Sequence, residues 1–331
     1  MQTMQTEPRA AAAETTSVAR GDLPSPRWTL HGLNNGYIFG ATCRIVAALP
    51  RGLTYAIGDV SMWLGWRLMD QTRLAIADNL LAIVPDEPQA ARERRALDTL
   101  RSYARDVIDF LHAIGATDAA QRELFDFRPE HLRLFETLLA QKRGIILVSG
   151  HYGNWEIGSV LMRVFNLPLT IVAMAEANPE VNRRRREMRD SLGVDTIEVR
   201  KSLDTALQIR RRLADNRIVA LLMDRHFGRD RVAVTLAGRR AWFLKTPALM
   251  GLMSGAPLVP CFIERTGRAR FSAQPGEPIF VATDLPREEA IRRATQQFAD
   301  QLSARLQAHP DYWYTFYRYW DSQRDADDPP V

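Results

Sequence analysis

The chain has 331 residues, of which 46% are hydrophobic and 25% charged, so it can bury a full core and is neither disordered nor fibrous. Its 44 Lys and Arg residues against 39 Asp and Glu residues give a net charge of +5, which favours anionic partners. Cys43 and Cys261 lie far apart in apolar surroundings, so they form neither a disulfide framework nor a metal-ligand spacing.

The first part of the chain is expected to be helical and to associate with a membrane. Residues 1–26 lack the apolar core of a secretory signal peptide, and their composition predicts a disordered tail. The next region, 27–128, contains the segment Leu33 to Trp66, which is apolar and aromatic but is interrupted by charged residues and by Pro50. Such a segment can lie on a bilayer surface but should not cross one.

Apolar residues at helical spacing predict three helices ahead of the first strand. They run from Thr72 to Val84, from Glu87 to Ala113 and from Pro129 to Lys142. Asp86 stands directly before the second of these helices and is expected to cap it.

Residues 129–320 are expected to form an α/β domain with a mixed, mainly parallel sheet flanked by helices, to which the helical N-terminal region is an extension. Short apolar runs predict strands at Ile145 to Val148, Leu169 to Met174, Ile218 to Met223 and Leu258 to Ile263. Helical stretches separate them at Asn178 to Leu192, Leu203 to Asp215 and Pro247 to Ser254. A closing helix from Arg287 to His309 precedes an aromatic segment and an acidic tail over 321–331.

His151 is the candidate catalytic residue, because it lies in a tight turn between the first buried strand and a helix. In open α/β sheets, ligands bind beyond the carboxyl ends of the strands. If Asn154 caps the helix, Glu156 lies in its first turn, where the loop can bring the imidazole onto the carboxylate. The helix N-terminus would stabilise that carboxylate as an anion. His151 and Glu156 are therefore a candidate pair of base and orienting acid.

The same His-x4-acid spacing occurs at His131 and Glu136, inside the predicted helix from Pro129 to Lys142. Two residues five apart on one helix are separated by about 140° around its axis, so their side chains cannot meet. Context rather than spacing selects His151.

Four sequence blocks carry a resemblance to a known family. The stretch GIILVSGHYGNWEIG resembles the catalytic block of the bacterial lipid A biosynthesis acyltransferases, a branch of the lysophospholipid acyltransferase superfamily that uses a His-x4-Asp or His-x4-Glu pair. Further agreement lies in NPEVNRRRREMRDSLG, in DRHFGRDRVAVTLAGRRAWFLKTPALMGLMSGAPLVPCFIER and in HPDYWYTFYRYW. The resemblance extends over most of Leu33 to Trp320. Two departures are the missing apolar membrane anchor and Arg225, where the family commonly has Gln.

The resemblance implies an O-acyltransferase that needs no cofactor, metal or covalent enzyme intermediate. His151 would take a proton from a hydroxyl of the acceptor lipid, which attacks the thioester of an acyl carrier protein or acyl-CoA donor, while Glu156 orients the imidazole. The acceptor would be a lipid A precursor or a related glycolipid. A lysophospholipid, a mannosylated lipid or an aminolipid remains an alternative, as does a non-catalytic protein that binds anionic lipid.

The implied location is the cytoplasmic face of the bacterial inner membrane, where the chain would be peripheral or monotopic on a surface containing anionic lipid. Nucleic acid is not expected as a partner, because basic residues are not interleaved with exposed aromatic ones and no recognisable module is present.

Substrate binding is assigned to residues outside the His-x4-Glu pair. Arg186 and Arg189 lie in the densest basic run, and their position in the family block favours them as ligands of the acceptor's phosphates. Asn154, Asp224 and Arg225 are also assigned to the substrate site.

Two further hypotheses concern the surroundings of the site. A metal cluster at Asp224, His226 and Asp230 is disfavoured, because the interleaved arginines would repel a cation. A tunnel for the acyl chain is expected among apolar residues near His151, namely Trp155, Ile157, Val160, Leu161, Phe243, Leu249 and Met253.

Overall fold

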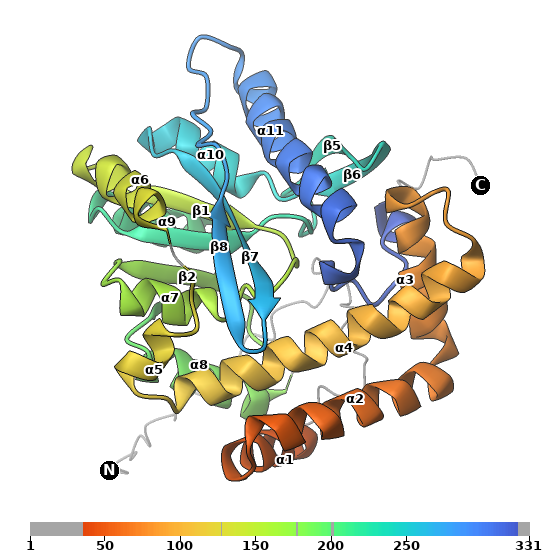
Figure 1. Cartoon of the computed structure of the whole chain (residues 1–331). Helices are drawn as coiled ribbons and strands as arrows, with labels where there is room; N and C mark the ends of the chain where they lie inside the picture. The colour runs from red at the N-terminus through yellow and green to blue at the C-terminus, as the bar shows by residue number, and fades with distance from the viewer. Residues whose placement is uncertain (1–35, 127, 177, 200–201, 324–331) are drawn as a thin grey trace, which may run out of the picture.

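The computed structural model describes residues 36–126, 128–176, 178–199 and 202–323. The predicted tail over 1–26 and residues 324–331 of the predicted acidic tail lie outside these ranges. Within them the chain forms an α/β structure around a six-stranded sheet in the order β3-β2-β4-β1-β7-β8 (Figure 1). The strands are parallel except for β8, which runs antiparallel to β7. The expected fold class is confirmed.

The strands of the sheet are β1 Ile145–Ser149, β2 Leu169–Ala173, β3 Asp195–Glu198, β4 Ile218–Leu222, β7 Leu258–Gly267 and β8 Arg270–Pro275. The four apolar runs in the sequence are all strands of this sheet. The strand β3 was not predicted from the sequence. It is an edge strand with mostly polar residues, of which only Ile197 is buried. A separate antiparallel hairpin, β5 Val232–Leu236 with β6 Arg239–Phe243, was also not predicted.

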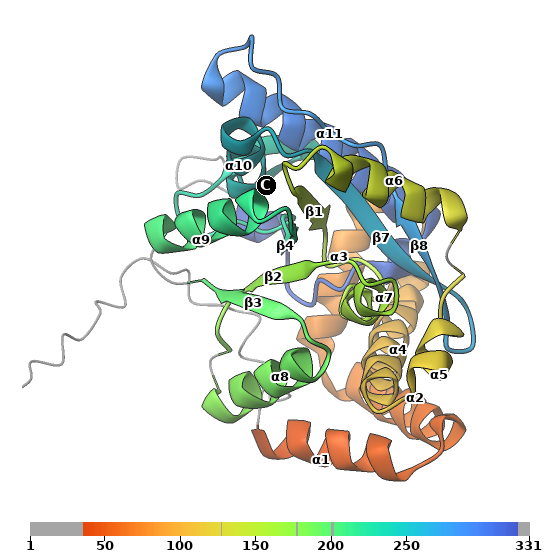
Figure 2. The same ribbon diagram turned by 90° about the vertical axis from the view of Figure 1, so that its left-hand side faces the viewer.

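Helices cover both faces of the sheet. The helices of the α/β region are α6 Pro129–Ala140, α7 Gly158–Val164, α8 Pro179–Ser191, α9 Ser202–Ala214, α10 Thr246–Ser254 and α11 Arg287–Ala308. Ile146 and Val148 of β1 pack into one core with α9, α10 and α11, whereas Ile145 packs into a second core with α6 and α7. Figure 2 shows α9 and α10 on one side of the sheet and α7 and α8 on the other.

The N-terminal region is helical, as expected. Its helices are α1 Gly36–Ala48, α2 Arg51–Leu68, α3 Asp70–Ile83, α4 Gln89–Ile114 and the short α5 Asp118–Arg122. The long helix α4 packs against α1, α2 and α3, and its buried residues Phe110 and Ala113 join the second core of the sheet (Figure 1). Over the residues that the structure describes, no helix has the length and apolar character needed to span a bilayer.

The predicted cap of α4 is wrong. The helix begins after Pro88, whose extended backbone occupies the N-cap position without any side-chain cap, and Asp86 lies in the preceding turn. The fixed φ of proline sets the entry into the helix, so the start of the helix lies beyond the reach of Asp86.

The loop after β1 is held directly on β7 by a glycine. Gly153 has a φ of +58°, and a Cβ at this position would lie 2.1 Å from the carbonyl oxygen of Ile263. On either side, the Gly153 amide donates to the Tyr312 carbonyl at 2.9 Å and the Asn154 amide donates to the Ile263 carbonyl at 3.0 Å. Only glycine combines this backbone conformation with so close an approach.

We therefore expect Gly153→Ala to destabilise the protein more than Gly193→Ala. Gly193 also has a positive φ, of +67°, but a Cβ there would meet nothing within 4 Å. The backbone conformation should cost about 1–2 kcal/mol in both variants, and the contact with Ile263 should cost about 1–3 kcal/mol more in Gly153→Ala alone. Denaturant unfolding measures both values, and equal losses of free energy would contradict the assigned role of the contact.

Candidate active site

His151 and Asp224 are brought together by two neighbouring parallel strands. β1 and β4 pair in register, with Ser149 opposite Leu222, so both strands end at the same level of the sheet. His151 follows β1 by two residues, and Asp224 follows β4 by two residues. Carboxyl ends of parallel strands are where α/β proteins place their ligands, and here they place a histidine beside an acid.

The carboxylate of Asp224 holds the imidazole of His151 in one orientation. Asp224 Oδ1 lies 2.7 Å from His151 Nδ1, and Oδ2 accepts the His151 backbone amide at 2.9 Å and the Trp313 indole N–H at 3.2 Å. The Asp224 side chain is fully buried, whereas that of His151 is 20% exposed. Among the described residues, His151 Nε2 has no hydrogen-bond partner, so this nitrogen is available to a substrate.

Gly150 makes this approach possible. A Cβ at Gly150 would lie 3.3 Å from the carboxyl group of Asp224, tighter than most packed contacts. Because glycine has no side chain, the acid can reach both the backbone and the ring of the next residue.

The two groups carry different charges at neutral pH. Burial lowers the pKa of His151 below its ordinary value, and the charge of Arg225 lowers it further, against the opposite effect of Asp224. Burial alone would raise the pKa of Asp224, but the attraction and hydrogen bond of His151 and the charge of Arg225 hold it below its ordinary value. Asp224 is therefore a carboxylate, and His151 is a neutral imidazole with a basic nitrogen.

Glu156 does not make the contact that the sequence suggested. Its carboxylate accepts a hydrogen bond from Arg185 Nη1 at 2.8 Å, and no hydrogen bond joins it to His151 among the described residues. The reason is local: α7 begins only at Gly158, and residues 155–157 form a turn that directs Glu156 towards α8. The acid that contacts Nδ1 is Asp224, which the sequence analysis assigned to the substrate site.

Asn154 supports the turn rather than capping α7. Its Oδ1 accepts the amide of Ile157 at 3.2 Å, and its Nδ2 donates to the carbonyl of Asp106 on α4 at 3.1 Å. Asn154 is buried, both ends of its amide are bonded to the protein, and it borders the cavity described next, so its assignment to the substrate site stays a prediction.

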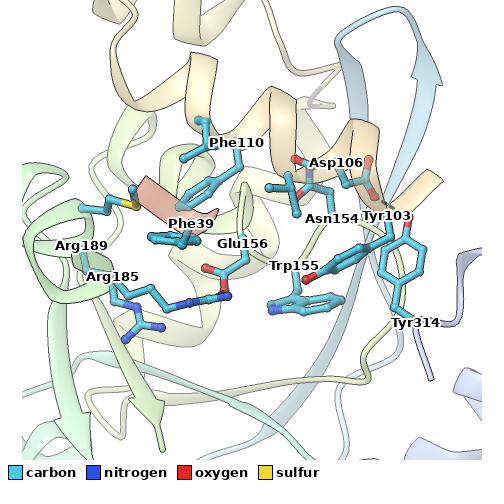
Figure 3. A pocket seen from close by; sticks show the side chains of 14 residues that line it. Phe39, Tyr103, Asp106, Phe110, Asn154, Trp155, Glu156, Arg185, Arg189 and Tyr314 are labelled. Carbon is cyan, nitrogen blue, oxygen red and sulfur yellow. Dashed lines mark hydrogen bonds and ion pairs between the residues drawn. The ribbon is translucent and has the colours of Figure 1, made fainter. Parts of the chain in front are cut away.

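A cavity of about 590 Å³, including its open mouth, lies beside the histidine loop (Figure 3). Its apolar lining comes from α1, α4 and α8 and includes Phe39, Val107, Phe110, Leu111 and Met188. Its charged lining residues are Asp106, Glu156, Arg185 and Arg189. The ring of Trp155 joins the cavity to the pair of His151 and Asp224, because it lines the cavity and meets the His151 ring edge-on with 5.3 Å between the ring centroids. An apolar cavity with a few charged groups is suited to a lipid.

Of the arginines on α8, the cavity selects Arg185 and Arg189. They are four residues apart and so share one face of the helix. Arg185 contacts both Glu156 and Glu176, the latter at 3.2 Å. Arg186 does not line this cavity: its side chain is 55% exposed and pairs with Glu198 at 2.7 Å. Arg185 was not predicted from the sequence, although its spacing of four residues from Arg189 places both side chains on one face of a helix.

Arg225 and Asp230 are not among the residues that line the cavity. Arg225 donates to the carbonyl of Tyr314 at 3.0 Å and so holds the C-terminal segment. Asp230 accepts the amide and the hydroxyl of Thr246 at the start of α10. In the described ranges, no group of His, Cys, Asp and Glu residues has the arrangement of a metal site. His131 lies on α6, as predicted.

The cavity does not have the lining that was predicted for an acyl-chain tunnel. Of the side chains proposed to line it, only Trp155 borders the cavity. Ile157, Val160 and Leu161 are fully buried in the core beneath the sheet, and Met253 is exposed. The apolar lining comes instead from α1, α4 and α8, and the sequence did not connect α4 with the site.

Residues 28–322 match the model of the bacterial lipid A biosynthesis acyltransferases. The chain belongs to this family. Over 305 residues it is 26% identical to a phosphatidylinositol mannoside acyltransferase of Mycolicibacterium smegmatis, covering 85% of this chain and 90% of that protein. A phosphatidylinositol mannoside acyltransferase of Mycobacterium tuberculosis is 26% identical over 188 residues, which are 56% of this chain and 57% of that protein. The chain is thus an O-acyltransferase that acts on lipid or glycolipid acceptors.

The charges around His151 predict how its imidazole titrates. The imidazole should remain neutral until the pH falls below 6.5, the ordinary value for histidine. Arg225→Gln should raise this pKa, because it removes a positive charge, and Asp224→Asn should lower it further, because it removes a negative one. NMR titration of the histidine Cε1 protons, assigned with His151→Ala, measures all three values. A wild-type midpoint above 6.5 would contradict the assignment.

Proposed function

We propose that this acyltransferase moves a fatty acyl group from a thioester donor to a hydroxyl of a glycolipid, with His151 as its general base. One observation carries the proposal: the imidazole is held at Nδ1 by the buried carboxylate of Asp224, while Nε2 has no partner within the described ranges and an apolar cavity adjoins the loop. A base must be neutral and oriented to accept a proton, and both conditions are met here.

The reaction follows from this geometry. His151 Nε2 takes the proton of the acceptor hydroxyl as its oxygen bonds to the carbonyl carbon of the thioester. Asp224 stabilises the resulting imidazolium and keeps Nδ1 protonated. When the tetrahedral intermediate collapses, the carbon–sulfur bond breaks and the imidazolium returns the proton to the departing thiolate. The products are an ester and a free thiol.

Glu156 is proposed to act through Arg185. Glu156 and Glu176 together hold the guanidinium of Arg185 at the cavity wall, where Arg189 lies on the same helix face. Two guanidinium groups at one wall suit the oxygen atoms of an acceptor phosphate. We therefore assign phosphate binding to Arg185 and Arg189 in place of Arg186 and Arg189.

The acceptor and the donor are separable by experiment. The family model supports a lipid A precursor, and the names of the two mycobacterial relatives support a mannosylated lipid. Mass analysis of lipid extracts from cells lacking the protein identifies the acceptor as the species that loses one acyl chain. Assays of the purified protein with acyl carrier protein and CoA thioesters of one chain length then identify the donor.

We also propose that α1 and α2 rest on the cytoplasmic surface of the inner membrane. Along one face of α2, large apolar residues are exposed at helical spacing: Leu53, Ile57, Val60, Leu64 and Leu68. Arg44 of α1 and Arg67 of α2 are exposed beside them and would meet anionic headgroups. On α1, Phe39 lines the cavity while Tyr37 and Ile38 face outward, so the cavity lies next to this surface.

Substitutions should separate the roles of the two acids. His151→Ala and Asp224→Asn should each lower kcat by about 10²-fold to 10⁴-fold, because one removes the base and the other its orienting charge. Glu156→Gln should mainly raise the KM of the acceptor, because it releases Arg185. Steady-state kinetics with a thioester donor measure these effects.

His131→Ala is the control and should be nearly normal. Activity of His151→Ala within tenfold of wild type would remove the proposed base. If Glu156→Gln lowers kcat as strongly as Asp224→Asn at unchanged KM, then Glu156 and not Asp224 has the orienting role.

For the membrane, we expect the protein to sediment with vesicles of phosphatidylglycerol and phosphatidylcholine at low salt and to be partly released as salt rises. Ile57→Glu combined with Leu64→Glu should weaken binding by at least about tenfold, because each removes an apolar side chain from the contact. Leu203→Glu with Leu207→Glu is the matched control, since these exposed leucines lie on α9, across the sheet from α8 (Figure 2). Equal losses in both pairs would exclude the α2 face, and release from cell membranes by detergent alone would indicate an integral anchor.

A further inference from the structure

Two buried carboxylates on α4 share one arginine. Asp106 and Asp109 each lie 2.5 Å from a different nitrogen of Arg265, which comes from β7. Asp109 also pairs with Arg51 at 3.1 Å. Each carboxylate accepts a hydrogen bond from one tyrosine hydroxyl: Tyr314 donates to Asp106 at 2.6 Å, and Tyr55 of α2 donates to Asp109 at 2.5 Å.

Only the Asp106 branch leads to the catalytic histidine. The backbone amide of Tyr314 donates to the carbonyl of His151 at 2.8 Å. The Tyr314 ring packs against Trp155 at 5.9 Å, and both rings line the cavity (Figure 3). The side chain of Asn154 donates to the carbonyl of Asp106, as described above. Asp106 is thus bound both to the loop that contains His151, through Asn154, and to the C-terminal segment, through Tyr314.

Burying a carboxylate at position 106 is unfavourable, because burial disfavours its charged form. Burial raises the pKa of Asp106 to about 6, although Arg265 and the hydroxyl of Tyr314 favour its charged form. An apolar residue of similar volume would avoid that cost only if Arg265 were replaced as well, because the guanidinium would otherwise lose one of its buried partners. What an apolar residue cannot do is accept the hydroxyl of Tyr314 and so fix the position of that residue.

We propose that Asp106 is a positioning residue, which acts through the hydroxyl of Tyr314 to fix the backbone of His151 and the aromatic wall between the base and the cavity. Asp109, with Tyr55, anchors α2 and has no part in this positioning. The inference rests on the proposed role of His151 as the base.

The two tyrosines supply a matched test. Tyr314→Phe and Tyr55→Phe each delete one hydroxyl from a carboxylate bound to Arg265 and keep the ring. Both should lower the midpoint of thermal unfolding by a similar amount. Tyr314→Phe should lower kcat by about tenfold to a hundredfold with little change in the KM of either substrate, because the base is displaced. Tyr55→Phe should leave kcat within twofold of wild type.

A double-mutant cycle connects the effect with Asp106. Asp106→Asn combined with Tyr314→Phe should lower kcat no further than the more damaging single variant, because both changes break the same link. If Tyr314→Phe does not fold, Asp106→Asn measured against Asp109→Asn makes the same comparison. An unchanged kcat in Tyr314→Phe, or an equal loss in Tyr55→Phe, would overturn the inference. A normal Tyr314→Phe beside an inactive His151→Ala leaves the proposed function standing, whereas an active His151→Ala removes that function itself.

Discussion

The carboxylate of Asp224 lies where two parallel strands end, and it binds the ring and the backbone of one histidine at once. Its two oxygen atoms contact the His151 ring, the His151 amide and the Trp313 indole. The carbonyl of Asp224 accepts the hydroxyl of Tyr319. A buried anion needs this many partners, because an unpaired one would be very unfavourable. The surrounding chain is arranged to supply them, which is why the C-terminal aromatic segment folds over the ends of the strands.

The three acids near the site differ in the group that each one binds. Asp224 is enclosed and bound to the imidazole, whereas Glu156 lies in the turn before α7 and binds a guanidinium at the cavity wall. Asp106 lies across the cavity on α4 and binds Arg265. Three carboxylates close in space therefore have three different cationic or proton-donating partners, and the partner defines what each one does.

The sequence predicted the sheet well where its strands are buried on both faces. The apolar runs of β1 and β4 have no polar alternative, so their burial is the only favourable solution. It did not predict β3, because one buried residue in a polar edge strand leaves little signal. The sequence singles out His151 because a histidine between a strand and a helix is unusual. The role of Asp224 was not found, because it lies 73 residues from His151 and depends on strand order, which local spacing does not record.

The sequence was limited in the same way in predicting which arginines of α8 line the cavity. Four consecutive arginines point in all directions around a helix, so the sequence alone does not specify which of them enter the cavity. Packing of α8 against α1 and β3 sets the rotation of the helix, and with it the choice of Arg185 and Arg189 over Arg186. Helix rotation is a property of tertiary contacts, and so is the contribution of α4 to the cavity wall.

His151, Asp224 and the C-terminal aromatic segment lie far apart in the sequence, so they are synthesised at different times. β1 acquires β4 as its neighbour only after β2, β3 and their helices have been made, and Trp313 and Tyr314 are added near the end of the described chain. Contacts between such distant segments form late in folding. A nascent chain that has emerged only as far as β3 therefore contains the histidine without its acid, and a chain that lacks the aromatic segment leaves that acid open to water. If His151 is the base, as proposed, the site is complete only once the C-terminal aromatic segment has been made.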